Sequence, residues 1–204
     1  MKRILLITLG LFLVVGVNAQ ARWGLKIGGN VSEMATTLGN NYLNVSKSRF
    51  GFHTGVVIEY AMAHSFGIQP ELSYVFNGAS YEGSDILGKS VEKGHITMHQ
   101  LQLPVNLKYW LGTENVKIFI TAGPYIGFGL LAESKIDGII CTTNLYGDNA
   151  ILKRFDFGIV AGLGFEVNKF VINAGYQFGI ANLSNVSNVK QHMGSLIFGI
   201  GCFF

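Results

Sequence analysis

The side chains that could carry catalysis in this chain are few, and their spacing does not suit it. Acyl hydrolysis needs a serine, a histidine and an acid that converge on one substrate. His192 and Ser195 are three residues apart, so in an extended strand they point to opposite faces, and no serine of matching parity accompanies His99. Peptide hydrolysis by paired carboxylates would need two carboxylates and a histidine at the outer rim of a barrel, and Asp156 is the one clear inward-facing candidate there. We therefore predict that the chain is not an enzyme.

Motifs for metals and cofactors offer no better candidate. Cys141 and Cys202 belong to no Cys-x-x-Cys or His/Cys metal spacing, and they are expected toward opposite ends of the fold, too far apart for a disulfide. The G-x-G stretches lie within alternating segments rather than before a helix, which argues against a nucleotide-binding loop. No group of acidic residues has the spacing of a calcium loop. We predict no cofactor, no metal and two unpaired cysteines.

A second set of charged side chains could act by pairing with one another. These residues alternate with bulky apolar residues, so they share one face of their segments. They are Lys26, Glu59, Glu71, Lys108, Lys117, Asp156 and Glu166. A buried charge costs on the order of several kcal/mol unless it finds a partner. We predict a structural network of ion pairs, and the alternative is a path for protons or solutes along the same charges.

The elements that position these charges are strands, and the clearest is RFDFGIVAGLGFEV, residues Arg154–Val167. Bulky apolar residues such as Phe157, Ile159 and Phe165 occupy every second position. The residues between them are charged, small or glycine. A period of two over this length predicts a β-strand with two different faces.

Seven other segments repeat this alternation, and together they predict an all-β, eight-stranded antiparallel up-and-down barrel. The eight expected strands are Arg22–Ser32, Arg49–Tyr60, Phe66–Phe76, Ile96–Tyr109, Val116–Leu130, Arg154–Val167, Phe170–Ala181 and Lys190–Phe204. The connections after the odd-numbered strands are long or polar, and those after the even-numbered strands are short. That asymmetry is typical of outer-membrane barrels, which have tight periplasmic turns and longer outer loops.

Composition favours the same class. Only 13% of the residues are charged, about half the usual share in soluble domains, and glycine is abundant at 27 residues. After the N-terminal region, no segment has eighteen consecutive apolar residues, so a membrane-spanning helix is not expected. Low charge without such a run suits a transmembrane barrel, in which alternation dilutes the apolar residues.

The first nineteen residues are predicted to be a secretory signal peptide. Lys2 and Arg3 form a positive start, Ile4–Val17 is an apolar core, and Ala19 ends a small-residue cleavage site. The domains expected are therefore a signal peptide over 1–19 and an outer-membrane barrel over 20–204. Loss of Lys2 and Arg3 leaves 13 basic against 12 acidic residues, so we expect no nucleic-acid partner.

Aromatic residues indicate which face meets lipid. They gather on the bulky face at the ends of the strands, with aliphatic residues between them. At the turn end they are Trp23, Tyr60, Phe66, Tyr109, Phe165, Phe170 and Phe204. Two aromatic girdles around an aliphatic band are the pattern of a membrane barrel. The alternative is a secreted, soluble, lipocalin-like barrel with the bulky face turned inward around a ligand.

The other face predicts a filled interior. The lumen of an eight-stranded barrel is only wide enough for side chains, and its glycines leave room for the charged residues. We therefore expect a plugged lumen and no open pore. An even number of strands places both termini in the periplasm. The long segments Leu131–Lys153 and Asn77–His95 would then be outer loops that contact partners.

Several strand motifs occur together in a characteristic order. They are GLKIGGNVS, QPELSY, LQLPVNLKYW, TAGPYIGFG and RFDFGIVAGLGFEV, and they extend over most of the chain after the signal. In these motifs the chain resembles the PorT-like outer-membrane β-barrel proteins of Bacteroidota. The resemblance implies an outer-membrane barrel in that phylum, and it brings no catalytic residues. One branch of the family is linked to protein secretion, so a secretion-associated component is an alternative function.

The function predicted from the sequence is that of a structural or interaction barrel. Its expected partners are outer-membrane lipids, proteins at the outer loops, and the barrel-assembly machinery, which would recognise the C-terminal strand ending at Phe204.

Overall fold

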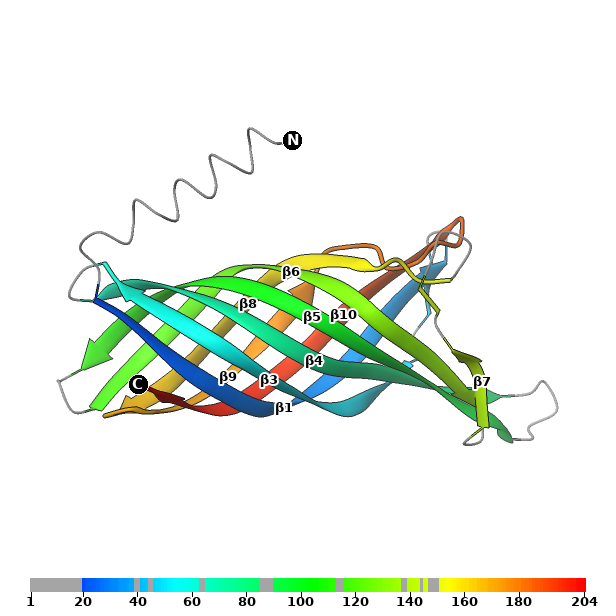
Figure 1. Cartoon of the computed structure of the whole chain (residues 1–204). Coiled ribbons are helices and arrows are strands. Elements are labelled where there is room, and N and C mark those ends of the chain that lie inside the picture. The colour runs from blue at the N-terminus through cyan, green and yellow to red at the C-terminus, as the bar shows by residue number, and fades with distance from the viewer. Residues whose placement is uncertain are drawn as a thin grey trace.

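The computed structural model is built of β-strands that form one ring (Figure 1). It describes residues 20–38, 41–43, 46–62, 65–84, 90–112, 116–136, 139–143, 145–146 and 151–204. The expected signal peptide, residues 1–19, lies outside these ranges. Within them, no helix is long and apolar enough to cross a membrane.

Eight long strands make the wall of the barrel. They are β1 Gln20–Leu38, β3 Ser46–Ala61, β4 Phe66–Ser84, β5 Ser90–Gly112, β6 Val116–Ile136, β8 Phe155–Val167, β9 Phe170–Gly179 and β10 Val189–Phe203. Two short strands, β2 Asn41–Leu43 and β7 Ile139–Thr143, extend the sheet by pairing with β1 and β6.

Antiparallel pairing between consecutive long strands, and between the last and the first, closes the ring. β10 pairs with β1 from Gly24 opposite Phe203 to Leu38 opposite Val189. The predicted eight-stranded antiparallel barrel is therefore confirmed. Closure leaves no unpaired edge in the wall, which a sheet in hydrocarbon requires because lipid offers no hydrogen bonds.

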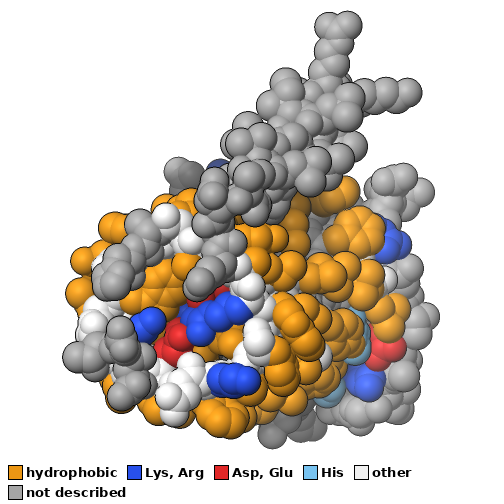
Figure 2. Space-filling model, turned by 60° about the vertical axis from the view of Figure 1, so that its left-hand side comes forward, with side chains coloured by type: hydrophobic (Ala, Val, Ile, Leu, Met, Phe, Trp, Pro, Cys, Tyr) orange, Lys and Arg blue, Asp and Glu red, His pale blue; other side chains and the backbone are white. Residues whose placement is uncertain are grey.

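Alternation along each strand separates an apolar exterior from a mixed interior. On β8, Phe155, Ile159 and Phe165 are exposed, whereas Asp156 and Glu166 on the opposite face are buried. Figure 2 shows hydrophobic side chains over most of the wall in view, with charged side chains gathered in the mouth of the barrel. The lipocalin-like alternative required the bulky face to point inward, and the structure places it outside.

Most of the long strands extend further than the alternation predicted. Asn77–His95, expected as a loop, is mostly strand, because β4 continues to Ser84 and β5 begins at Ser90. Leu131–Lys153, also expected as a loop, is strand as far as Ile136 and again over Ile139–Thr143. β1 likewise continues to Leu38. Beyond the lipid, the outer face of a strand meets water, so backbone pairing continues after the apolar alternation has ended.

The expected strands Arg154–Val167 and Phe170–Ala181 leave only two residues between them, and the structure has a tight turn at these two residues, Asn168-Lys169. Asn168 has φ of 55°, a left-handed conformation that asparagine tolerates better than most residues. The backbone N–H of Phe203 donates to the carbonyl of Lys169 at 2.8 Å, so the end of β10 packs against this turn.

Candidate functional site

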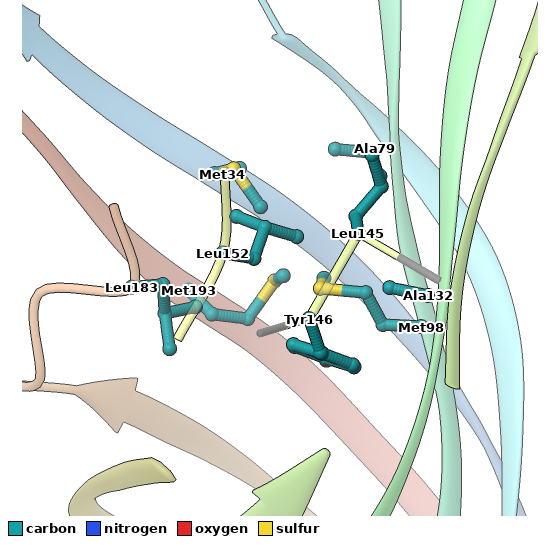
Figure 3. Packing of buried hydrophobic residues seen from close by; sticks show 9 residues of the cluster. All are labelled: Met34, Ala79, Met98, Ala132, Leu145, Tyr146, Leu152, Leu183 and Met193. Carbon is teal, nitrogen blue, oxygen red and sulfur yellow. The ribbon is translucent and has the colours of Figure 1, made fainter. Parts of the chain in front are cut away.

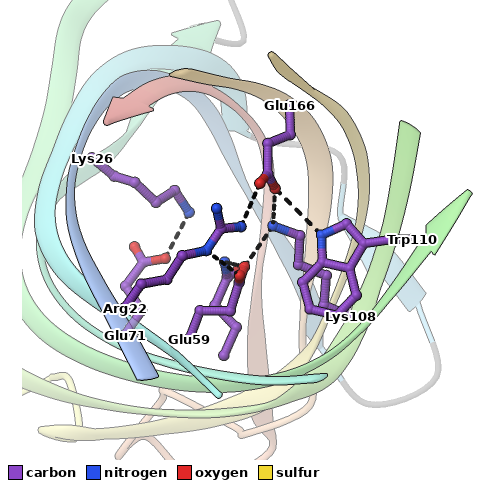
Figure 4. Close-up of polar contacts among 8 residues, drawn as sticks. Arg22, Lys26, Glu59, Glu71, Lys108, Trp110 and Glu166 are labelled. Atoms are coloured by element: carbon purple, nitrogen blue, oxygen red, sulfur yellow. Dashed lines mark hydrogen bonds and ion pairs between the residues drawn. The ribbon is translucent and has the colours of Figure 1, made fainter. Parts of the chain in front are cut away.

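A layer of ion pairs crosses the lumen at the turn end. Lys108 is fully buried, and its Nζ lies 2.7 Å from Oε2 of Glu59 and 3.1 Å from Oε2 of Glu166. Arg22 bridges the same two carboxylates, at 2.5 Å in each case. Figure 4 shows the four side chains converging from β1, β3, β5 and β8. Two cations and two anions therefore neutralise one another inside the barrel, as buried charges require.

Neighbouring side chains close the remaining space in this layer. Trp110 donates its indole N–H to Glu166 at 3.3 Å, and Gln69 donates to Glu59 at 3.2 Å. The Lys108 ammonium lies 4.1 Å from the ring centre of Phe119, a cation–π distance. The packed apolar residues around this layer are Val57, Trp110, Phe119, Val171 and Phe203.

The other charges predicted for the lumen are distributed along it. Lys26 pairs with Glu71 at 2.6 Å, and Ser73 also donates to Glu71. Asp156 lies further from the turns and accepts a hydrogen bond from Tyr125 at 3.1 Å. Lys117 lies opposite Glu166 in the register but is half-exposed, and the described contacts include no ion pair for it. Asp156 and Lys117 therefore lie apart from the ion pairs.

Arg22 was not among the charges predicted for the lumen. The expected strand began at Arg22, and the inward-facing positions Gly24 and Lys26 have the same parity. Counting back from Lys26 in steps of two, through Gly24, would have placed Arg22 inside the barrel. The inward position of Arg22 could therefore have been predicted from the alternation of the strand.

A small chamber of about 60 Å³, lined by both apolar and polar residues, lies further from the turns than the ion-pair layer. His53 Nδ1, Asn106 Oδ1 and Asn173 Oδ1 border it and have no hydrogen-bond partner among the described residues. One water needs about 10–15 Å³ measured in this way, so the chamber suits a few waters and excludes a solute of drug size. Polar atoms without protein partners are the groups that such waters satisfy.

An apolar cluster fills the lumen at the loop end (Figure 3). Strand residues and residues of two connections meet inside the wall. They are Met34, Ala79, Met98, Ala132, Leu145, Tyr146, Leu152, Leu183 and Met193. The connection before β8, expected as an outer loop, therefore returns partly into the barrel. Its apolar pairs Leu145-Tyr146 and Ile151-Leu152, in a mostly polar stretch, were the available signal.

Backbone hydrogen bonds hold this returning segment in place. The N–H of Leu145 donates to Ala132 on β6 at 2.8 Å, and the N–H of Leu152 donates to Leu145 at 3.0 Å. The ring of Tyr146 lies directly over Gly129, where a Cβ atom would come within 2.3 Å of its Cζ. Because Gly129 has no side chain, it leaves the space that the Tyr146 ring occupies. We call Leu145, Tyr146 and Leu152 the lumen plug.

Replacing Gly129 by alanine should loosen the lumen plug, because the added methyl group occupies the place of the Tyr146 ring. In a background with Cys141→Ser and Cys202→Ser, a Leu152→Cys reporter, buried at 1% exposure, should react with maleimide about tenfold faster once the plug opens. The matched control is Gly127→Ala on the same strand, where the new Cβ has no contact shorter than 3.4 Å. Equal labelling rates in the two alanine variants would contradict this account of the plug.

The aromatic residues predicted for the turn-end girdle lie on the outer face near that end. Trp23 stacks on Phe204 and Phe66 packs on Tyr109, each pair with ring centres 4.6 Å apart. Tyr60 and Tyr109 are half-buried. The exposed members are Trp23, Phe66, Phe165, Phe170 and Phe204.

Cysteines and metal-binding residues add no further site in the described part of the chain. Cys202 is a free thiol, and the side chain of Cys141 lies outside the described part. No three His, Cys, Asp or Glu side chains in the described ranges lie close enough together to hold a metal ion.

Solved membrane barrels resemble this architecture. Neisserial surface protein A is 14% identical with a TM-score of 0.50, over 91% of this chain and 99% of that one. OprG from Pseudomonas aeruginosa is 13% identical with a TM-score of 0.48, over 91% and 97%. Ail of Yersinia pestis, solved with the heparin analogue sucrose octasulfate, is 17% identical with a TM-score of 0.44, over 91% and 99%. These likenesses concern the fold alone.

Sequence comparison with families identifies the chain more directly. No curated protein matches it. A family model described as the outer membrane protein beta-barrel domain matches residues 18–185, which is most of the chain. The predicted outer-membrane location agrees with this match, and the apolar outer face is the surface that such a location requires. The chain belongs to the outer membrane protein beta-barrel domain family.

Proposed function

We propose that this protein is a closed outer-membrane barrel that anchors its outer loops at the cell surface and catalyses no reaction. The observation that carries the proposal is the closure of the lumen at both ends. The ion-pair layer around Lys108 fills one end, the lumen plug fills the other, and the chamber between them is only about 60 Å³. A lumen filled in this way gives a solute no continuous path.

The proposal includes an orientation. Gln20 pairs with Ala61 near the short turns, and the N–H of Phe204 donates to Trp23 at 2.8 Å, so the beginning of β1 and the C-terminus share one end. We place that end in the periplasm, after removal of a signal peptide over residues 1–19. The longer connections then face the outside, where they contact protein partners. The assembly machinery would meet the last strand at Phe204.

The finer PorT-like assignment within Bacteroidota rests on the strand motifs, and it is part of the proposal. The matched family is broader than that group. A secretion-associated role would act through the outer loops, since the closed lumen leaves no room for a polypeptide.

Planar lipid bilayers test the closed lumen. The purified full chain should give no stable conductance steps, because ions would have to pass the buried pairs of Arg22 and Lys108 with Glu59 and Glu166. A variant without residues 145–152 should also stay closed, because the ion-pair layer remains. Steady ohmic conductance by the unmodified chain would contradict the proposal. Conductance by the deletion variant would show that the ion-pair layer alone does not block the passage of ions.

A further inference from the structure

A bulge in β3 turns Arg49 onto the outer wall. The register between β3 and β4 shifts between Ser48 and Phe52, which adds one residue on the β3 side. Gly78 on β4 lies between the inward-facing residues Asn77 and Ala79, so its missing side chain would point outward. A Cβ atom there would lie 2.7 Å from Cδ of Arg49. The Arg49 side chain therefore crosses β4 on the outer surface, over a glycine.

The guanidinium of Arg49 is held in a fixed position on β5. Its Nη1 donates to the carbonyl of Ile96 at 3.1 Å and to Oγ1 of Thr97 at 2.7 Å. Its Cζ lies 6.0 Å from the ring centre of Phe76. Among the described residues, Nε and Nη2 have no hydrogen-bond partner, so the remaining N–H donors of the fork are available to an outside acceptor.

Two more nitrogen-bearing side chains lie beside Arg49 on the same face. In the register, His95 on β5 is opposite Lys135 on β6, three positions from Met98 and Ala132, which form an inward-facing pair. Parity therefore turns His95 and Lys135 outward. We call Arg49, His95 and Lys135 the outer basic cluster.

The outer basic cluster carries a net positive charge. Glu133, opposite Thr97, is its acidic neighbour, with Oε2 3.8 Å from Nζ of Lys135. Burial, and then the charges of Arg49 and Lys135, lower the pKa of His95. Figure 2 shows histidine side chains next to acidic and basic ones on the outer wall, toward the loop end.

The height of the outer basic cluster matches the edge of the membrane. Arg49 pairs with Ser32 on β1, nine residues beyond Trp23 in the turn-end girdle. At roughly 3.3 Å per residue and a strand tilt of about 40°, this separation spans roughly 23 Å along the barrel axis. The apolar band of outer-membrane barrels is about 25 Å tall. Arg49 therefore lies where lipid headgroups begin, above the aromatic residues Phe52 and Phe76. His95, fourteen residues from Tyr109 on β5, and its partner Lys135 lie further out, roughly 35 Å from the turn-end girdle by the same measure, among the headgroups.

We propose that the outer basic cluster binds the phosphate group of a membrane lipid. A fixed guanidinium offers a fork of donors that matches phosphate oxygens, and the Lys135 ammonium adds a mobile point charge. The acyl chains of that lipid then lie along the exposed aromatic and aliphatic wall below. This assignment goes beyond the anchoring function and does not depend on closure of the lumen.

Native mass spectrometry of the full chain in detergent tests the site, with phosphatidic acid as the probe and diacylglycerol as its phosphate-free counterpart. Phosphatidic acid should form a one-lipid adduct at least about tenfold more tightly than diacylglycerol. Arg49→Gln combined with Lys135→Gln should remove most of that preference. Lys153→Gln combined with Lys169→Gln removes the same charge at exposed positions elsewhere and should leave the preference intact.

Two further measurements complete the test. One distinguishes loss of binding from a folding defect, and the other distinguishes a lipid ligand from free phosphate. Lys135→Gln alone loses only the 3.8 Å contact with Glu133, so it should fold normally and still weaken phosphatidic acid binding severalfold. Equal binding by the cluster variant and the control variant would overturn the proposal. Displacement of the lipid by an equal concentration of inorganic phosphate would also overturn it, because the site would then select free phosphate rather than a lipid.

Discussion

Replacing Ile159 by arginine should prevent efficient assembly of the barrel. Ile159 is 48% exposed on the outer face of β8, opposite Pro124 on β6 and Phe178 on β9. It lies six residues from the turn-end aromatic Phe165, which at roughly 3.3 Å per residue and the usual tilt puts it near the middle of the apolar band. Arginine at that depth costs about 2–4 kcal/mol. Folding into lipid vesicles, followed by heat-modifiable gel mobility and urea titration, measures the loss.

The matched control is Leu38→Arg at the loop end of β1. Leu38 is equally exposed, at 48%, but it lies fifteen residues beyond Trp23 and therefore outside the hydrocarbon. The same substitution there should change the free energy of unfolding by about 1 kcal/mol or less. If both variants lost the same stability, depth in the membrane would not explain the effect, and the assignment of the outer face to lipid would be wrong.

The wall of the barrel could be predicted from the sequence because a membrane strand keeps strict parity. Lipid on one side and a narrow lumen on the other leave no tolerance for a side chain on the wrong face. Alternation in the stretch from Phe155 to Val167 is therefore enough to place Phe157 outside and Glu166 inside, as the burial along β8 confirms. The same reasoning predicted that the lumen would be filled.

The parts that parity did not predict are those where this constraint ends. On the strand extensions beyond the membrane the outer face meets water instead of lipid, so the outward positions of β4 and β5 need not be apolar and the alternation no longer marks these strands. The lumen plug depends on a connection folding back onto Gly129, a contact between distant segments that no local pattern specifies. Arg49 faces outward because the bulge in β3 breaks the parity on which the prediction relied.

Replacing Lys108 by methionine should cause the largest loss of stability in the lumen. Lys108 is fully buried and is the shared partner of Glu59 and Glu166. Methionine has a similar length and keeps the packing, but it leaves two buried carboxylates with Arg22 as the one cation that contacts both. Removing one partner of a buried ion pair costs about 3–5 kcal/mol, because the other charge stays uncompensated. Urea unfolding in lipid vesicles at neutral pH measures this cost.

A second substitution separates loss of charge balance from loss of packing. Adding Glu166→Gln to Lys108→Met leaves Arg22 and Glu59 as one cation and one anion, 2.5 Å apart, so charge balance returns. The double variant should therefore be more stable than Lys108→Met alone, although it carries one more substitution. Lys190→Met, at an exposed position on β10, is the control and should stay within about 0.5 kcal/mol of the unmodified chain. A double variant less stable than the single one would mean that Lys108 acts mainly through its cation–π contacts with Trp110 and Phe119, and that the ion pairs are secondary.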